Sequence, residues 1–238
     1  MSADVNKKAL TYVRENWRNL VVNYCNLDEY PPVPKPVTIF MAGCPGVGKT
    51  EYSRGLVKQL EIQFYPEKFI RLDVDELREI MPGYVGTNSD EVQPACSKLF
   101  TKIYDHIRHN NQHAVIDGTF SGKGSVENVR VALERGRSVG ITYLYQDPFI
   151  AWEYAKKREK LEGRTVSKDY FISAFLDSID MVNKVKEEFE QKITLDVSIK
   201  NGDNDFVKKS HFNVPSLKGY IKHTFAADFL QRNLPNVI

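Results

Sequence analysis

An eight-residue segment constrains this chain most strongly, because it fits the pattern G-x-x-x-x-G-K-[S/T] at every fixed position. In a loop of this kind the glycines let the backbone wrap around an anion, so that successive N–H groups point at phosphate oxygens. The lysine reaches the β- and γ-phosphates, and the threonine hydroxyl holds Mg²⁺. The eight residues are Gly43, Cys44, Pro45, Gly46, Val47, Gly48, Lys49 and Thr50.

The sequence around this loop has the order that a phosphate-binding loop requires. A β-rich run over residues 37–41 precedes it, and a helical run follows it with Tyr52, Leu56 and Leu60 on one face. In that arrangement the positive end of the helix faces the bound anion. We therefore predict that the loop binds the phosphates of ATP.

The rest of the chain alternates short β-rich runs with amphipathic helical runs. Asp147 followed by Pro148 is a typical helix start, and Ser167 is another. This alternation predicts an α/β P-loop NTPase fold, with a parallel sheet of about five strands and helices on both faces. The expected strands are residues 37–41, 69–72, 114–116, 139–145 and 193–199.

Changes in sequence pattern divide the chain into three segments. Residues 1–36 contain an amphipathic helix over 3–24 and a proline-rich connector, residues 37–200 form the P-loop core, and residues 201–238 form a tail. The tail begins with polar residues and is expected to be helical near 217–230. We expect the leading helix to pack on the core; the alternative is a partner-docking or self-inhibitory element.

Composition limits the choice of partners and compartment. The 33 Lys and Arg residues nearly balance the 31 Asp and Glu residues, for a net charge of +2, so nucleic acid is not the expected partner. The longest apolar run is far shorter than the ~18 residues that span a bilayer. The three cysteines show neither metal nor disulfide spacing. We expect a cytoplasmic protein without a membrane partner.

Carboxylates follow two of the predicted strands. Asp73 and Asp75 come at the end of the second strand, and Asp117 ends the third. Ligands of open α/β sheets bind beyond the carboxyl ends of the strands, so these side chains are expected beside the phosphates. There a carboxylate accepts a proton from an attacking hydroxyl or holds the metal. In an extended segment Asp73 and Asp75 share one side, although either could instead cap the following helix.

A basic segment over residues 156–168 follows the fourth strand and its helix. Because Gly163 is typical of a helix end and Ser167 of a helix start, Arg164 is expected on a short loop between two helices. An arginine on a mobile loop can move onto the γ-phosphoryl group and neutralise transition-state charge. Arg158 is a second candidate for this role, or it belongs to a solvated helix face.

In combination these stretches resemble the zeta-toxin family of P-loop kinases over about residues 37–200. The resemblance implies an ATP-dependent kinase. The best-known members phosphorylate the 3′-hydroxyl of UDP-N-acetylglucosamine and are held by an antitoxin. The matching stretches are residues 43–50, 73–78 with 82–84, 117–119 and 163–166.

The resemblance also implies roles for individual residues. Asp117 departs from the family pattern, because the characterised toxins typically carry glutamate there, and the shorter aspartate side chain lacks one methylene. The implied roles are the catalytic base on Asp75, ATP phosphates on Lys49, metal on Thr50, lid arginines on Arg158 and Arg164, and substrate or metal contacts on Asp117 and Thr119. Asp73 is a candidate substrate contact because of its place at the end of the second strand.

We therefore predict an ATP- and Mg²⁺-dependent kinase that phosphorylates a hydroxyl of a small molecule. The first candidate acceptor is a nucleotide sugar such as UDP-N-acetylglucosamine, with the protein as the toxin of a toxin–antitoxin pair. Two alternatives remain open at this point. One is a kinase of nucleic-acid 5′ ends or of an antibiotic; the other is an ATP-gated interaction module without phosphotransfer.

Overall fold

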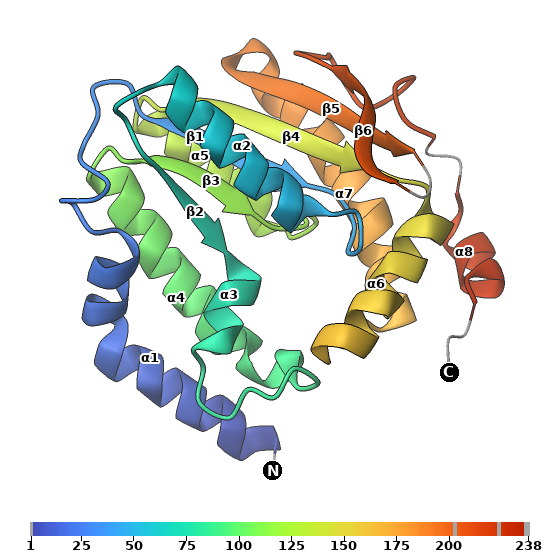
Figure 1. Ribbon diagram of the computed structural model, residues 1–238, viewed down its shortest axis with the longest axis horizontal. Coiled ribbons are helices and arrows are strands. Elements are labelled where there is room, and N and C mark those ends of the chain that lie inside the picture. The colour runs from blue at the N-terminus through green and yellow to red at the C-terminus, as the bar shows by residue number, and fades with distance from the viewer. Residues whose placement is uncertain (1, 202–203, 223–224, 236–238) are drawn as a thin grey trace.

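The computed structural model describes residues 2–201, 204–222 and 225–235. Within these residues, one six-stranded sheet has the strand order β2-β3-β1-β4-β5-β6 (Figure 1). The five predicted strands are parallel, and β6 runs antiparallel to β5 along one edge. The strands are β1 (Val37–Ala42), β2 (Phe69–Asp73), β3 (His113–Asp117), β4 (Ser138–Tyr145), β5 (Ile193–Asn201) and β6 (Asn204–His211).

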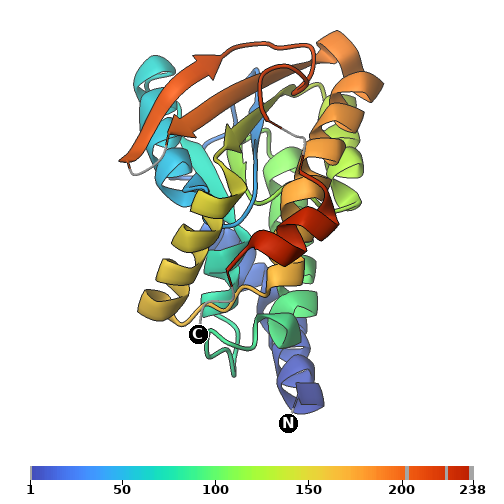
Figure 2. The ribbon, with the colours of Figure 1, turned by 90° about the vertical axis from the view of Figure 1, so that its right-hand side faces the viewer.

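Helices cover both faces of this sheet, so the predicted α/β P-loop fold is confirmed. Helix α2 (Lys49–Gln63) lies on one face. The other face is covered by α4, α5 and α7, and the two views agree on this arrangement (Figures 1 and 2). The three helices are α4 (Ser89–His109), α5 (Gly124–Glu134) and α7 (Lys168–Phe189).

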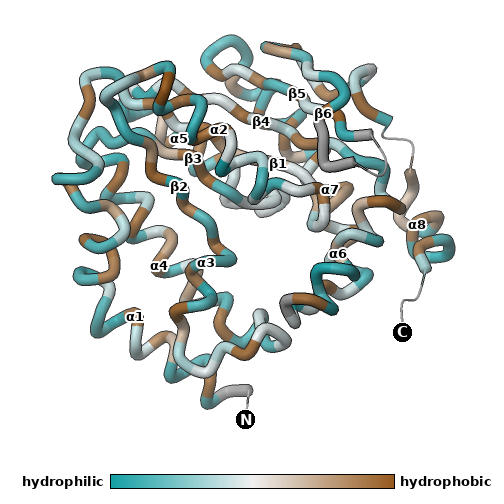
Figure 3. Tube along the Cα trace, in the orientation of Figure 1, coloured by the Kyte–Doolittle hydropathy of each residue, from teal (hydrophilic) through white to brown (hydrophobic). Residues whose placement is uncertain are grey.

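The N-terminal helix α1 (Ser2–Tyr24) packs against α4, as its hydrophobic stripe predicts. In Figure 3 brown and teal alternate along both helices, which is the pattern of amphipathic surfaces in contact. Ala9 and Val21 of α1 are buried. The amide of Gln112 also donates to the carbonyls of Cys25 and Tyr30, at 3.0 and 2.8 Å, which ties the connector to the core.

The tail differs from its prediction. Its first part extends the sheet as β6. Its helix α8 spans Ala227–Asn233, so the helix predicted near 217–230 is present only from residue 227 and ends later than expected. Gly219 has a φ of +85°, which a helix does not tolerate, and Pro215 lacks a backbone donor just before this segment. Residues 202–203, 223–224 and 236–238 of the tail lie outside the described residues.

Two helices lie beyond the carboxyl ends of the strands and face each other there: α3 (Val74–Glu79) and α6 (Pro148–Glu162). The predicted N-caps of α6 and α7 are both present. The Asp147 carboxylate accepts from the Phe149 N–H at 2.9 Å, and Ser167 Oγ accepts from the Tyr170 N–H at 3.2 Å. A short 3-10 helix, Glu190–Lys192, joins α7 to β5. Among the described residues, no helix combines the length and hydrophobicity needed to cross a membrane.

Candidate active site

The phosphate-binding loop joins β1 to α2 and requires its glycines. Gly43, Gly46 and Gly48 have φ values of +134°, +78° and +80°, where a side chain is strained. A β-carbon at Gly43 would stand 2.5 Å from the Leu144 carbonyl, and one at Gly46 would overlap the Ala151 carbonyl of α6. The loop is therefore pressed between the end of β4 and the first turns of α6.

Lys49 is folded back inside this loop. Its ammonium group donates to the carbonyls of Gly43 and Cys44, at 2.9 and 2.7 Å. Burial lowers the pKa of Lys49, while the surrounding acidic groups, including Asp117 and Asp75, act in the opposite direction. A bound phosphate would supply the negative charge that this desolvated cation lacks.

Behind the loop, Arg71 of β2 joins the carboxylates of two strands. Its Nη1 donates to Asp73 Oδ2 at 2.8 Å and to Asp117 Oδ2 at 3.1 Å, and its Nη2 contacts Glu76. Ser53 of α2 donates to the same Asp117 oxygen at 2.6 Å. The sequence did not identify Arg71 or Ser53 as site residues. The period-two alternation of β2, which places Arg71 on the same side as Asp73, was the available signal for Arg71.

Asp117 lies deeper in the protein than the sequence suggested, with only 3% of its surface exposed. Burial raises the pKa of Asp117, and the neighbouring Asp73 charge raises it further; Ser53, Lys49 and Arg71 oppose this shift. The next predicted contact, Thr119, serves the loop itself. Its carbonyl accepts from the Gly43 N–H at 3.2 Å, and its hydroxyl is hydrogen-bonded to that of Ser121 at 2.8 Å.

Asp73 and Asp75 do not share the side of one strand, because the strand ends at Asp73. The Asp73 carboxylate caps α3 by accepting from the Asp75 N–H at 2.8 Å. The expectation that the two side chains share one side of an extended segment is therefore wrong. The alternative, in which one of them caps the following helix, is confirmed. Asp75 therefore lies in the first turn of α3, and the helical backbone sets the direction of its carboxylate.

Two arginines hold the Asp75 carboxylate. Arg78 Nη1 donates to Oδ1 at 2.7 Å, and Arg164 Nη1 lies 3.5 Å from Oδ2. Arg164 also forms an ion pair with Glu79 at the end of α3. Arg164 stands on the loop between α6 and α7, as predicted, and it bridges that loop to α3. Arg78, which the sequence did not single out, is braced in turn by Gln93 at 2.8 Å.

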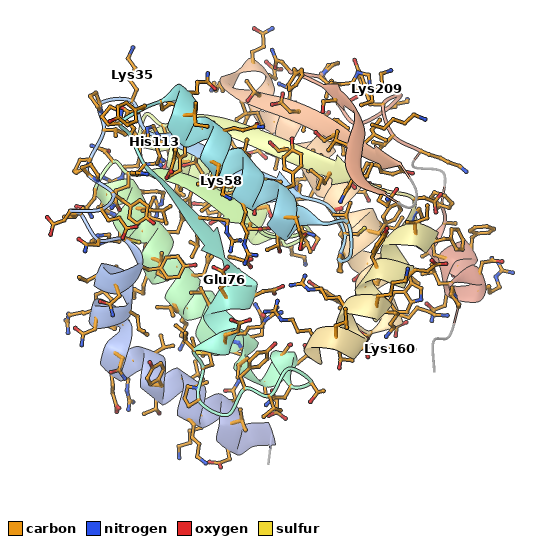
Figure 4. The ribbon with its side chains drawn as sticks, in the orientation of Figure 1. Lys35, Lys58, Glu76, His113, Lys160 and Lys209 are labelled. Carbon is orange, nitrogen blue, oxygen red and sulfur yellow. The ribbon has the colours of Figure 1, made fainter. Side chains whose placement is uncertain are left out.

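A cavity of about 310 Å³ lies between α2, α3 and α6, and its lining includes Asp73 and Arg164 but not Lys49, Asp75 or Asp117. Figure 4 shows Glu76 on α3 and Lys160 near the end of α6 on opposite sides of this space. The structure brings together four predicted site residues here, namely Thr50, Asp73, Arg158 and Arg164. The remaining lining residues are Glu51, Arg54, Glu76 and Glu79.

The residues present fit Mg²⁺, which prefers oxygen ligands and commonly takes one or two carboxylates together with phosphates and water. Thr50 and Asp73 both line the cavity and supply such oxygens. Among the described residues, no cluster of three or more His, Cys, Asp or Glu side chains has the geometry of a metal site.

This protein has the fold of the P-loop kinases. It has a parallel sheet, a phosphate-binding loop after β1, and two arginines, Arg158 of α6 and Arg164 of the loop between α6 and α7, that line the cavity together with Thr50 of the loop. The family is shown by the sequence as a whole. Residues 5–210 match the model of the family described as Zeta toxin, and the chain belongs to this family. The match extends beyond residues 37–200 and includes most of α1 and the whole proline-rich connector.

Solved structures share the fold of this chain at low sequence identity. A structure described as the PezAT chromosomal toxin–antitoxin system of Streptococcus pneumoniae aligns with a TM-score of 0.62 and 16% identity, covering 92% of this chain and 86% of the other. A structure of AvrRxo1-ORF1:-ORF2 with ATP aligns with a TM-score of 0.57 and 12% identity, covering 88% of this chain and 65% of the other. The search of curated proteins found no match. Membership of this family supports a kinase-type phosphotransferase.

Proposed function

We propose that this protein is an ATP- and Mg²⁺-dependent kinase that transfers the γ-phosphoryl group to a hydroxyl of a small molecule. The observation that carries the proposal is the cavity of about 310 Å³, in which Thr50 of the phosphate-binding loop and the carboxylate of Asp73 face Arg158 and Arg164. Oxygen ligands on one side and guanidinium groups on the other are the polarity that phosphoryl transfer uses.

Asp75 is the proposed general base. Its carboxylate Oδ2 lies 3.5 Å from Arg164, which lines the cavity. Asp75 would take the proton of the acceptor hydroxyl at Oδ2 once Arg164 moves from that oxygen toward the transferred phosphoryl group. Arg78 keeps hold of Oδ1, so the carboxylate stays oriented while Oδ2 becomes available. Asp75 and Arg164 thus act in one step from opposite sides.

The phosphate side of the site is assigned to Lys49, Thr50 and Asp73. Lys49 binds the β- and γ-phosphate oxygens in place of the loop carbonyls that it contacts here. Thr50 and Asp73 would hold Mg²⁺, which when bound neutralises charge on the transferring group. Asp117, predicted from the sequence as a metal or substrate contact, would instead support Asp73 through their shared partner Arg71.

The proposed acceptor is a nucleotide sugar such as UDP-N-acetylglucosamine. Family membership supports this choice, together with a strongly polar cavity that pairs guanidinium groups for phosphates with carboxylates for hydroxyls. Thr119 is kept as a proposed substrate contact next to the loop. The cytoplasm is the proposed compartment. A protein antitoxin is a proposed partner, since one structural neighbour is described as a toxin–antitoxin system.

Incubation with labelled ATP, Mg²⁺ and either UDP-N-acetylglucosamine or a metabolite extract, followed by mass spectrometry, tests the proposal. We expect one acceptor to gain a phosphoryl group with the wild-type protein and none with Lys49→Ala, which should remain folded by circular dichroism. ATP binding without any phosphorylated acceptor would instead favour the ATP-gated module. Phosphorylation of oligonucleotide 5′ ends, lost at high salt, would favour the nucleic-acid kinase.

A further inference from the structure

Lys200, at the carboxyl end of β5, is a buried cation that the site described above does not include. It comes from the opposite side of the sheet order to Asp73 and Asp117: β2 and β3 flank β1 on one side, and β4 and β5 on the other. Only 8% of its surface is exposed.

The ammonium group of Lys200 lies against the phosphate-binding loop. A β-carbon added to Gly48 would strike Lys200 Nζ and would stand 3.8 Å from its Cε. Gly48 is the residue directly before α2, where the unpaired N–H groups of the helix begin. Lys200 Nζ therefore lies at the positive end of α2, beside the place where the loop binds an anion.

Neighbouring contacts direct the side chain to this position. Ser198, two residues earlier on β5, is hydrogen-bonded to the Tyr52 hydroxyl of α2 at 3.1 Å. Residues two apart on a strand face the same side, so Ser198 and Lys200 both face α2. Strand β5 therefore contacts α2 twice. Ser198 is hydrogen-bonded to the helix, and the ammonium group of Lys200 lies at its first turn.

The direction of the nucleotide decides which of its groups reaches Lys200. The γ-phosphate belongs on the side of Thr50, Asp73 and Arg164, which line the cavity next to β2. A triphosphate whose γ-phosphate lies there and whose other phosphates follow the loop would have its nucleoside end on the side of β4 and β5. Lys200 stands on that side.

We propose that Lys200 binds the phosphate at the nucleoside end of the nucleotide, the α-phosphate of a nucleoside di- or triphosphate. We assign Lys200 to an anion because its ammonium group is positively charged and stands beside a helix start that favours negative charge. The inference rests on the proposed function only in requiring that the loop binds ATP. Lys49 and Lys200 would then hold the two ends of the triphosphate.

Calorimetric titration of the full chain with Mg²⁺-ATP, Mg²⁺-ADP and Mg²⁺-GTP tests the assignment, with Lys200→Met as the variant. Methionine keeps most of the apolar stem and removes the charge. We expect the dissociation constants of all three nucleotides to rise by about tenfold, the size of one charge-assisted hydrogen bond. The matched control is Lys209→Met on β6, an exposed lysine at the edge of the sheet (Figure 4), which should leave all three unchanged.

Three results would overturn the assignment. The first is an unchanged affinity of Lys200→Met for all three nucleotides. The second is a weaker affinity for ATP with the affinity for ADP unchanged, which would assign Lys200 to the γ-phosphate. The third is a weaker affinity for ATP and ADP with the affinity for GTP unchanged, which would assign Lys200 to the base. Thermal unfolding without nucleotide shows whether the variant is folded. If the wild-type protein itself binds no nucleotide, the proposed function fails; if it binds and the variant matches it, only the role of Lys200 fails.

Discussion

At the scale of single residues, the site depends on arginines that hold its carboxylates. Arg71 keeps Asp73 and Asp117 together although their side chains carry like charge, and Arg78 fixes one oxygen of Asp75. Removing the carboxylate of Asp75 therefore leaves Arg78 with its second partner Gln93, and local order should survive.

We predict that Asp75→Asn lowers the rate of phosphoryl transfer by about 10²- to 10⁴-fold, because an amide cannot accept the proton of the acceptor hydroxyl. Steady-state kinetics with the identified acceptor measures the loss. Asp105→Asn is the matched control, since Asp105 pairs with Arg108 at the same spacing along a helix and lies outside the cavity. Near wild-type turnover in Asp75→Asn would transfer the base role to Asp73 or Asp117.

At the scale of elements, the loop between α6 and α7 is held across the cavity by one side chain. Arg164 pairs with Asp75 and Glu79 of α3, so this side chain bridges α3 to the loop. The same arginine is proposed to neutralise the transferring phosphoryl group, which requires it to exchange these partners.

Arg164→Ala is predicted to lower kcat by about 10³-fold, the lower end of the effect of an arginine that stabilises phosphoryl transfer, while ATP affinity changes little. Arg158→Ala should have a smaller effect, and Arg130→Ala, which removes an exposed arginine from a surface ion pair, should have none. Rapid-quench measurement of the transfer step separates these outcomes from changes in product release. Unaltered transfer in Arg164→Ala would show that the bridge to α3 is structural.

The N-terminal helix belongs to the core by its packing, which gives a second prediction at this scale. Val21 is 3% exposed, and its neighbour Val22 is 57% exposed. Val21→Ala should lower the free energy of unfolding by about 2 kcal/mol, and Val22→Ala by less than about 0.5 kcal/mol. Urea unfolding of the two variants measures both values. Equal stabilities, or higher kinase activity in Val21→Ala, would support the self-inhibitory alternative instead.

At the scale of the whole molecule, stability should depend on pH through a buried histidine. His113 accepts a hydrogen bond from the Val37 N–H at 3.0 Å, and its other ring nitrogen is bonded to Glu67 at 2.7 Å. Burial lowers the pKa of His113, although the Glu67 contact opposes the shift. Below a pH of about 6.5 the unfolded chain therefore binds more protons than the folded one, and stability falls as the pH falls.

We predict that the melting temperature of the wild-type protein drops between pH 7.5 and pH 5.5, and that His113→Gln melts lower at pH 7.5 but varies less with pH. Burial also lowers the pKa of His106, so His106→Gln should remove a second, separate part of the pH dependence. Calorimetric scans at several pH values distinguish the two. A His113→Gln variant with the full wild-type dependence would contradict this account.

The sequence predicted those features that depend on residues close together along the chain. They include the phosphate-binding loop, the five parallel strands and the N-caps at Asp147 and Ser167. These could be predicted because capping hydrogen bonds and hydrophobic periodicity involve residues only a few positions apart. Family membership, indicated by the combination of motifs, is likewise a property of the sequence. The strand β6 was missed, since its polar and basic sequence becomes a strand only through pairing with β5.

Only the tertiary structure decided how the charged groups are combined. Arg71 and Asp117 are 46 residues apart in the chain, and Arg164 and Glu79 are 85 apart, yet each pair is in contact. The position of Lys200 against Gly48 likewise follows from the packing of β5 on α2. Coulomb interaction depends on distance in space and on burial, and neither is encoded by local pattern. The sequence by itself therefore determined the loop and the fold class, whereas packing determined which cations and carboxylates share the site.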